Sequence, residues 1–534
     1  MKELLTGNEA IARGAWEAGV VVCTAYPGTP STEITENAAK YDEMYAEWSP
    51  NEKVALEVGL GASIAGARTL VSMKHVGVNV AADPLFTLAY TGINGGLVLV
   101  SADDPGMHSS QNEQDNRYFG KAAKIPVLEP SNSQEAKDFT KLAYELSEKY
   151  DTPVMLRPTT RVAHSQSLVE LEERQNVGVK DYTKDTLKYV MIPAYARLRH
   201  VAVEARLEEL KKYAEVSPIN RIEWNDKKIG IITSGITYQY VKETVKDASV
   251  LKLGMTFPLP AKLIREFSQG VDILYVIEEL EPFIEDFVKS LGIDIVGKEL
   301  FPNIGEILPE TINEKLLGKY LNPAPVLNTP VRPPVLCPGC PHRGLFYVLN
   351  KLKVTVTGDI GCYTLGSLAP LNSIDTTICM GASIGTAIGM EKARGKDFAR
   401  NLVAIIGDST FIHSGITGLI DVVYNKATTT TIILDNRITG MTGHQQNPTT
   451  GYTIKGEPTK EVNLELLVKA IGIDRITVID PFDVDNLERI IKEELAAEEP
   501  SVIITRRKCA LIEKGINTTT CIIDENNALA ACAV

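Results

Sequence analysis

The sequence lacks an excess of positive charge. Its 55 lysines and arginines stand against 68 aspartates and glutamates, which leaves a formal net charge of −13 over 534 residues. A chain of this sign creates no global field that attracts a nucleic-acid backbone or an anionic membrane surface. We therefore expect neither nucleic acid nor a membrane among its partners.

The sequence also lacks long apolar runs, and its cysteines are too few to suggest a disulfide-stabilised fold. No stretch reaches the roughly 18 uninterrupted apolar residues that a membrane-spanning helix needs, and the opening Met-Lys-Glu-Leu-Leu-Thr does not have the pattern of a secretory signal. Eight cysteines in a chain of this size do not indicate a disulfide framework. We expect a cytoplasmic protein that folds without covalent cross-links.

Short runs of β-branched residues are present throughout and alternate with segments of helical period. Examples are Ile-Gly-Ile-Ile-Thr at 229–233 and Leu-Val-Ala-Ile-Ile at 402–406. Such alternation predicts an α/β fold in which buried parallel strands are layered with helices. At about 150 residues per domain the length suggests three to four domains.

Two breaks in this pattern set the expected domain boundaries. Residues 186–226 combine a charged helical stretch with a polar segment, and we interpret them as a helical linker. The prolines that crowd 322–334 are incompatible with a helix or a central strand. The sequence therefore predicts three parallel-sheet α/β domains near 1–185, 227–315 and 330–512.

Two polar motifs in the last of these domains each follow an apolar run. Gly407-Asp408-Ser409 follows one run, and Asp435-Asn436 follows the next, with Asn436 standing 436 − 408 = 28 positions after Asp408. Hard oxygen ligands at the ends of neighbouring parallel strands can share one divalent ion with a diphosphate. Gly-Asp-Ser alone would indicate only a helix cap. The spacing of both motifs favours a Mg²⁺-diphosphate site over paired caps.

This arrangement resembles the thiamine-diphosphate motif. The resemblance implies that Asp408 and Asn436 bind Mg²⁺ through their side chains and Ile438 through its backbone carbonyl. It also implies that the diphosphate lies against the Gly407 turn and the backbone amides of Ser409 and Thr410.

A thiamine cofactor needs a carboxylate that exchanges a proton with its aminopyrimidine ring. Glu52 stands at the entrance of an expected helix rich in small residues, and Glu57 is the rival candidate one turn later. The alternative for Glu52 is that it only complements the helix dipole.

Further motifs extend over roughly residues 5–512. They are Tyr-Pro-Gly-Thr-Pro-Ser (26–31), Met-Lys-His-Val-Gly (73–77), Ser-Ala-Asp-Asp-Pro-Gly (101–106), His-Ser-Ser-Gln-Asn-Glu-Gln-Asp (108–115), Glu-Glu-Leu-Glu-Pro-Phe (278–283), Cys-Pro-Gly-Cys-Pro-His-Arg (337–343) and Gly-Asp-Ile-Gly-Cys-Tyr-Thr-Leu-Gly (358–366). With these motifs the chain resembles the 2-oxoacid:ferredoxin oxidoreductases, in particular the large subunits of the indolepyruvate type.

The resemblance implies a pyrimidine-binding domain at 1–185, a transketolase-C-terminal-like domain at 227–315 and a diphosphate-binding domain at 330–512. It favours Glu52 over Glu57 as the activating carboxylate. It also implies a small (beta) subunit as partner and a homodimer of heterodimers as the assembly.

The reaction implied is oxidative decarboxylation of an aryl pyruvate to an aryl-acetyl-CoA, with coenzyme A as co-substrate and electrons leaving singly. Thr29 would contact the carboxylate or keto oxygen of the substrate. Arg117 and Lys121 are the candidates for neutralising the carboxylate, and the forked guanidinium favours Arg117. The alternative is a non-oxidative thiamine-dependent 2-oxoacid decarboxylase or carboligase, which would need neither coenzyme A nor iron.

Four cysteines decide between these two reactions. Cys337, Cys340, Cys362 and Cys509 match the family's ligands for one 4Fe-4S cluster, although spacing alone would also suit a structural zinc or inert buried thiols. The family's usual C-terminal ferredoxin domain is expected to be missing, with 513–534 as its remnant. Electrons would then pass to ferredoxin or to a separate ferredoxin-like subunit.

Overall fold

The computed structural model describes residues 1–319 and 333–513. The chain divides into two compact units. Unit 1 comprises Met1–Val331 together with Gln445–Glu461, and unit 2 comprises Arg332–His444 and Val462–Val534. The segment predicted as a ferredoxin remnant lies, apart from its first residue, outside the described residues.

Unit 1 is built around a seven-stranded sheet in the order β12-β6-β7-β5-β4-β2-β3. Neighbouring strands run parallel except β12, which pairs antiparallel with β6. The strands are β2 (Val22–Ala25), β3 (Tyr45–Trp48), β4 (Thr69–Lys74), β5 (Leu97–Ala102), β6 (Val127–Leu128), β7 (Val154–Leu156) and β12 (Met255–Phe257). A separate antiparallel pair joins β1 (Lys2–Thr6) to β8 (Gln166–Glu170).

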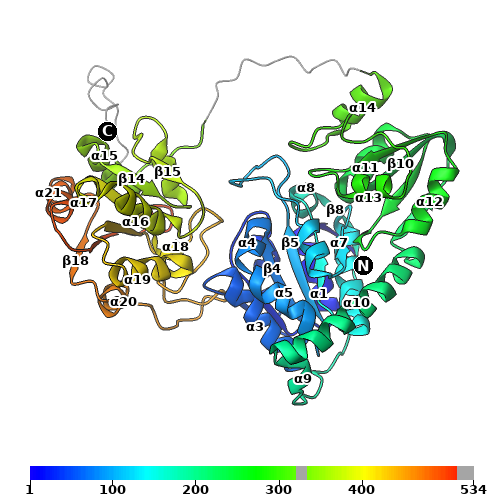
Figure 1. The fold of residues 1–534 in the computed structure, drawn as a ribbon, viewed down its shortest axis with the longest axis horizontal. Helices are drawn as coiled ribbons and strands as arrows, with labels where there is room; N and C mark the ends of the chain where they lie inside the picture. The colour runs from blue at the N-terminus through cyan, green and yellow to red at the C-terminus, as the bar shows by residue number, and fades with distance from the viewer. Residues whose placement is uncertain (320–332, 514–534) are drawn as a thin grey trace. The chain divides into compact units, whose positions relative to one another are not determined.

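Helices cover both faces of this sheet (Figure 1). Val98 and Val100 of β5 pack in the core beneath α1 and α7, whereas Leu97 and Leu99 pack beneath α3 and α5. Alternate residues of a strand face opposite sides, so a strand buried on both sides is apolar throughout. The helices are α1 (Gly7–Glu17), α2 (Thr32–Ala38), α3 (Glu52–Ile64), α4 (His75–Val80), α5 (Ala82–Thr91), α6 (Arg117–Ala123), α7 (Ser133–Tyr150) and α8 (Thr160–His164).

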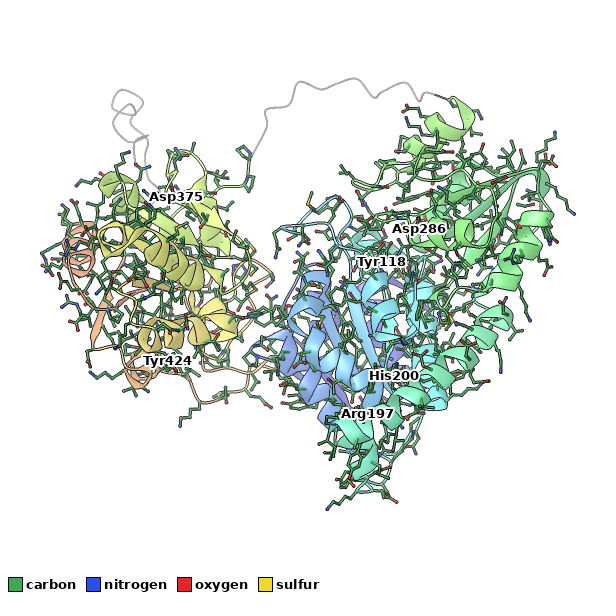
Figure 2. All side chains as sticks on the ribbon, viewed as in Figure 1. Tyr118, Arg197, His200, Asp286, Asp375 and Tyr424 are labelled. Carbon is green, nitrogen blue, oxygen red and sulfur yellow. The ribbon has the colours of Figure 1, made fainter. Side chains whose placement is uncertain are left out.

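The predicted linker contains ordered elements that join both sheets of unit 1. Helix α9 (Thr186–Tyr189) precedes α10 (Pro193–Val216), and His200 of α10 lies 5.4 Å from the ring of Tyr90 in α5 (Figure 2). Arg206, also in α10, donates to the carbonyl of Ala89 at 2.7 Å. Strand β9 (Asn220–Glu223) follows and enters the second sheet.

This second sheet has the order β13-β10-β11-β9. Its strands β10 (Asp226–Ser234), β11 (Ala248–Leu253) and β13 (Ile273–Ile277) are parallel, and β9 is antiparallel to β11. The helices that accompany it are α11 (Gly235–Thr244), α12 (Ala261–Gln269), α13 (Phe283–Ser290) and α14 (Pro309–Leu317).

Unit 2 contains a six-stranded sheet, all parallel, in the order β15-β14-β16-β17-β19-β18. Its strands are β14 (Thr355–Gly358), β15 (Thr376–Thr377), β16 (Leu402–Gly407), β17 (Thr430–Asp435), β18 (Arg475–Ile479) and β19 (Ser501–Arg506). Val403 and Ile405 face the core under α15 and α21, and Leu402 and Ala404 face the core under α16 and α19. The helices are α15 (His342–Leu352), α16 (Ala382–Arg394), α17 (Lys396–Ala399), α18 (Asp408–Thr410), α19 (Ile416–Tyr424), α20 (Leu464–Ile471) and α21 (Val484–Leu495).

The predicted α/β class with three largely parallel sheets is confirmed, and the antiparallel strands β9 and β12 lie at sheet edges. The three α/β regions do not follow one another without interruption along the chain. Residues 445–461 lie within the third region in the sequence but pack in unit 1. There Gln445 donates to the carboxylate of Glu36 at 2.7 Å, and Lys455 donates to the carbonyl of Met44 at 3.2 Å. Among the described residues no helix is both long and apolar enough to cross a bilayer.

Candidate functional site

Glu52 is the first residue of α3 and is buried, with 6% of its surface exposed. The preceding Asn51 caps the helix, since its side chain accepts from the backbone N–H of Val54 at 2.9 Å. Glu57 lies on the outer face of the same helix, where its half-exposed carboxylate pairs with Lys53. Burial therefore separates the two candidates and leaves Glu52 as the carboxylate held inside the fold.

Close packing fixes where the Glu52 carboxylate lies. A Cβ atom added to Gly77, in α4, would come within 2.7 Å of both Cγ and Oε1 of Glu52. Only a glycine permits this approach, because atoms without a mutual bond need about 3.5 Å. The Glu52 side chain thus lies against α4, which begins directly after β4.

The turn that carries Thr29 follows β2, the neighbour of β4 in the sheet. Ser31 closes the turn by donating from its backbone N–H and its Oγ to the carbonyl of Gly28, each at 2.8 Å. Gly28 in turn lies against Lys74, whose Cβ would be 3.0 Å from a Cβ at residue 28. The Thr29 turn, Lys74 and Glu52 therefore all lie at the carboxyl end of β2 and β4.

His75 is fully buried at the same edge. Its Nε2 lies 3.3 Å from the carbonyl oxygen of Asn112, and its Nδ1 has no hydrogen-bond partner among the described residues. Its own carbonyl accepts from Asn116 at 3.0 Å. A buried ring nitrogen without a partner is uncommon in folded proteins. His75 is the first residue of α4, the helix against which the Glu52 side chain packs.

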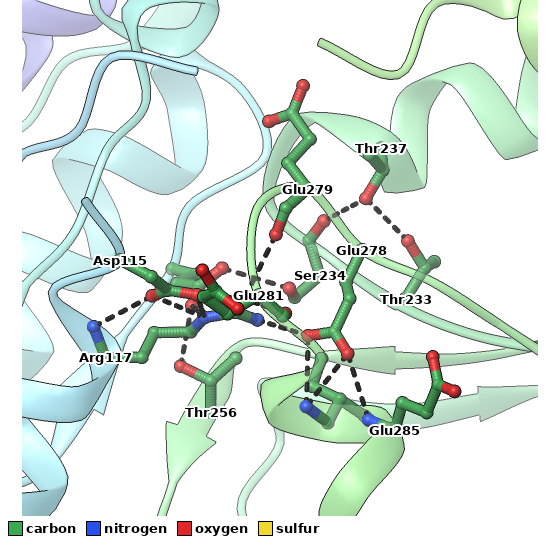
Figure 3. Close-up of polar contacts among 12 residues, drawn as sticks. Asp115, Arg117, Thr233, Ser234, Thr237, Thr256, Glu278, Glu279, Glu281 and Glu285 are labelled. Atoms are coloured by element: carbon green, nitrogen blue, oxygen red, sulfur yellow. Dashed lines mark hydrogen bonds and ion pairs between the residues drawn. The ribbon is translucent and has the colours of Figure 1, made fainter. Parts of the chain in front are cut away.

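The structure places Arg117 differently from the prediction (Figure 3). Its guanidinium is buried, donating to the Asp115 carboxylate at 2.5 Å, to Glu278 at 2.6 Å and to backbone carbonyls in the turn 279–281. Burial disfavours the charge, yet Asp115 and Glu278 outweigh it and raise the pKa of Arg117 well above its ordinary value. Arg117 as a ligand of the substrate carboxylate is therefore not supported, because protein carboxylates already occupy its fork. It joins the first sheet of unit 1 to the second.

Lys121 lies one turn further along α6, on the side of Phe283. Its ammonium lies 5.4 Å from the centre of the Phe283 ring and 6.0 Å from that of Tyr118, the residue labelled in Figure 2. Together with Phe257 it lines an apolar groove of about 390 Å³. The cation that the structure shows against the Thr29 turn is Lys74, which packs on Gly28.

In unit 2, Asp408 and Asn436 follow strands that are direct neighbours. β16 and β17 pair in parallel with Gly407 opposite Leu434, so Asp408 and Asn436 stand at the same edge. Both are buried. Oδ1 of Asp408 accepts the backbone N–H of Ser409 at 2.8 Å, and Oδ1 of Asn436 accepts that of Ile438 at 3.3 Å.

The two strand-end loops are joined to each other. Thr439 donates from Oγ1 to Oγ of Ser409 at 3.0 Å, and Thr410 donates to the carbonyl of Ile360 at 3.1 Å. A carboxylate, an amide oxygen and a nearby carbonyl are hard oxygen donors of the kind that Mg²⁺ accepts. The donor set of Asp408, Asn436 and Ile438 therefore fits a magnesium ion held against a diphosphate.

The four predicted cluster ligands gather close to this edge of unit 2. Cys337 and Cys340 share one turn, in which the Cys340 N–H donates to the Cys337 carbonyl at 3.1 Å. The Sγ of Cys362 would lie 3.5 Å from a Cβ at Gly440, and the Cys509 N–H donates to the carbonyl of Asn436 at 3.0 Å. Cys362 and Cys509 thus lie against the loop that carries the predicted magnesium ligands, and Cys337 and Cys340 lie near enough to them to interact electrostatically.

The thiols interact electrostatically but do not converge on one point. Burial raises the pKa of Cys340 to about 11, and Cys337, Cys362 and Cys509 act in the same direction. In the described parts of the chain no group of three or more His, Cys, Asp or Glu side chains is arranged around a single ion.

Sequence analysis missed two residues of this site, Lys74 and Gly77. Both belong to the Met-Lys-His-Val-Gly motif, whose position after an apolar run was the available signal. Their roles depend on contacts with Gly28 and Glu52, which are distant in sequence.

Comparison with known proteins identifies related chains. Residues 13–216 match the family "Pyruvate flavodoxin/ferredoxin oxidoreductase, thiamine diP-bdg", and residues 359–505 match "Thiamine pyrophosphate enzyme, C-terminal TPP binding domain". A protein named indolepyruvate oxidoreductase subunit IorA from Archaeoglobus fulgidus is 43% identical over 96% of this chain and 87% of its own length. A protein of the same name from Pyrococcus horikoshii is also 43% identical, over 96% of this chain and 86% of its own.

A solved structure shares the fold at low sequence identity. A chain of the 2-oxoglutarate:ferredoxin oxidoreductase from Magnetococcus marinus is 17% identical, with a TM-score of 0.50 over 59% of this chain and 65% of that one. The family matches cover the segments that contain Glu52, Asp408 and Asn436. By its similarity to these relatives over nearly its whole length, the chain belongs to the 2-oxoacid:ferredoxin oxidoreductase family of thiamine-diphosphate-binding oxidoreductases.

Proposed function

We propose that this chain is the large, thiamine-diphosphate-binding subunit of an enzyme that oxidatively decarboxylates aryl pyruvates to aryl-acetyl-CoA. Electrons pass singly through one 4Fe-4S cluster to ferredoxin or a ferredoxin-like subunit. The aryl pyruvate preference rests on the relatives named indolepyruvate oxidoreductase. The assembly proposed is a homodimer of heterodimers with a small (beta) subunit.

The three predicted domains have separate roles in this proposal. Residues 1–185 form the pyrimidine-binding domain, 227–315 the transketolase-C-terminal-like domain and 330–512 the diphosphate-binding domain. When bound, thiamine diphosphate would supply a nucleophilic carbon that adds to the keto group and a positively charged thiazolium ring that accepts the electron pair left by decarboxylation. Asp408, Asn436 and the Ile438 carbonyl hold its Mg²⁺, and the amides of Ser409 and Thr410 bind phosphate oxygens.

Glu52 performs the proton transfer in unit 1. Its buried carboxylate holds a proton at the aminopyrimidine ring nitrogen, an interaction that a surface carboxylate such as Glu57 cannot make. Thr29, in the turn beside Lys74, donates to the carboxylate or keto oxygen of the substrate. Burial of Glu52 keeps water from competing for this proton.

One observation favours the oxidative reaction over simple decarboxylation. The Cys509 N–H donates to the Asn436 carbonyl, so the cysteine quartet adjoins the proposed magnesium loop. One-electron oxidation needs an acceptor close to the cofactor, whereas non-oxidative decarboxylation needs none. The position of the quartet therefore supports an iron-sulfur cluster that serves the reaction.

Two measurements test the proposal. Anaerobically purified protein should contain about four irons per chain, and stoichiometric zinc without iron would contradict the oxidative mechanism. Asp408→Ala should abolish calorimetric binding of thiamine diphosphate with Mg²⁺. The matched control is Asp397→Ala, because Asp397 is 97% exposed on α17 and its pairing with Arg400, at 3.3 Å, is a surface contact. Unchanged affinity in Asp408→Ala would refute the magnesium assignment.

A further inference from the structure

Lys74 is the last residue of β4, an interior strand between β5 and β2 in the seven-stranded sheet, and is 8% exposed. Its aliphatic stem packs against Gly28, the residue before Thr29. A Cβ atom added to Gly28 would lie only 3.0 Å from the Cβ of Lys74. Its Nζ donates to the carbonyl of Ser109, in the loop that follows β5. The ammonium group is thereby held between the Thr29 turn and this second loop.

No carboxylate forms an ion pair with Lys74 within the described residues. Asp104 is the acidic residue that acts on it electrostatically, but its oxygens already accept from Ser109, Ser110 and Thr160 at 2.9, 2.6 and 2.7 Å. Burial lowers the pKa of Lys74 to about 8, and Asp104 compensates only in part. The protonated form is thus paired with neutral acceptors alone.

Two other buried lysines in unit 1 show the usual arrangement. Lys137 lies 3.3 Å from the carboxylate of Glu17, and Lys252 pairs with Glu135. Removing an ammonium group from water without a counter-ion costs several kcal/mol, which explains why these two are paired. Lys74 has no such ion pair among the described residues, and only the Ser109 carbonyl and the nearby Asp104 charge offset part of this cost.

We propose that Lys74 binds the carboxylate of the 2-oxoacid substrate, with Thr29 contacting the same end of the molecule. The inference rests on the proposed function and assigns to Lys74 the role that sequence reasoning gave to Arg117. A monoanionic carboxylate is the ligand whose charge and size match one buried ammonium between two loops. A second, distal carboxylate would find no further partner in Lys74.

This contact acts on binding more than on bond cleavage. The carboxylate carries its full charge before the C–C bond breaks and loses that charge as CO₂ leaves, so the ion pair is strongest with the bound substrate. An interaction of this kind lowers KM rather than raising kcat. Loss of Lys74 should therefore raise KM for an aryl pyruvate while kcat changes much less.

A pair of unreactive probes isolates the charge. 3-Phenylpropionate and 3-phenylpropionamide have the same shape, and only the first carries a carboxylate. Their inhibition constants are to be measured on the anaerobic holoenzyme with its small subunit and thiamine diphosphate. Hydrogen bonds to charged groups contribute about 1.5–3 kcal/mol, so the wild type should bind the acid at least about tenfold more tightly than the amide.

Lys74→Met should abolish this preference and leave the inhibition constant of the amide unchanged, whereas Lys74→Arg should retain a preference for the acid. A purely structural role would weaken both probes equally. Lys121→Met is the matched control, because Lys121 lies against Phe283 on α6, and its acid preference should equal that of the wild type. If Lys74→Met does not fold, Lys74→Gln serves for the same comparison.

The outcomes separate the inference from the proposed function. An acid preference that persists without Lys74, or that is absent in the wild type, would overturn the role of Lys74. Failure of the wild type to bind thiamine diphosphate or to turn over any 2-oxoacid would instead overturn the proposed function.

Discussion

Replacing Gly77 by alanine tests whether the position of Glu52 matters to the reaction. The new methyl carbon would lie 2.7 Å from Cγ and Oε1 of Glu52. Gly77 lies within helix α4 and its φ is negative, so its backbone conformation is one that alanine adopts without strain. The side chain of Glu52 is the part that must yield.

The size of the effect follows from the contact distance. To restore an ordinary separation of about 3.5 Å, the Glu52 carboxylate must move by nearly 1 Å. A displacement of that order in a catalytic group costs about 10²-fold in rate, which corresponds to about 2.7 kcal/mol in activation free energy. Stability should change little, because alanine is favoured over glycine in a helix by about 1 kcal/mol, which offsets the crowding.

The assay is proton exchange at C2 of bound thiamine diphosphate, followed by NMR, alongside thermal unfolding and calorimetric cofactor binding. Gly77→Ala should exchange about 10²-fold more slowly while its Tm and cofactor affinity stay near those of the wild type. Gly61→Ala is the control, since Gly61 lies in the same helix as Glu52 and a Cβ there meets no atom within 4 Å. Wild-type exchange in Gly77→Ala would refute the role of Glu52.

Three further changes have defined outcomes. Glu52→Gln should bind the cofactor but slow C2 proton exchange by about 10²-fold or more, whereas Glu57→Gln should exchange normally. Cys509→Ser should lower the iron content and alter the visible spectrum of the anaerobic protein. Burial and the nearby charge of Glu306 raise the pKa of Glu279 to about 7. An unfolded chain ionises this carboxyl group near pH 4.3, so the free energy of unfolding falls as the pH rises from about 4.3 to 7. Glu279→Gln should therefore raise Tm relative to the wild type at pH 8 and lose that advantage at pH 4.

Local signals predicted the diphosphate side of the site well. Asp408 follows an apolar strand and Asn436 follows a strand with an apolar run, and parallel neighbours place such residues at one edge. β16 and β17 are neighbours in the sheet, and the pairing of Gly407 with Leu434 places Asp408 and Asn436 at the same edge. Their joint role as magnesium ligands stays a prediction.

The substrate side could not be predicted in this way. Arg117 and Lys121 were chosen because a cation was needed and both stand near a motif, but the partner of a charged side chain is decided by packing. Glu278 belongs to a strand end of the second sheet, 161 residues from Arg117. Lys74 ends an apolar strand, a position from which sequence pattern alone predicts burial but not an unpaired charge.

The buried acids and bases of unit 1 explain why one arginine is structural and one lysine is available. Arg117 and Arg157 share Asp115 and Glu129, and Arg157 also pairs with Asp103 at 2.6 Å. These carboxylates lie against both guanidinium groups, and Arg117 also pairs with Glu278, which follows β13 of the second sheet. Asp103 is thereby committed to Arg157, and its neighbour Asp104 holds the loop that covers Lys74. Among the described residues, Asp103 and Asp104 are thus held by other partners and form no ion pair with Lys74, which is why we propose that the substrate supplies the anion.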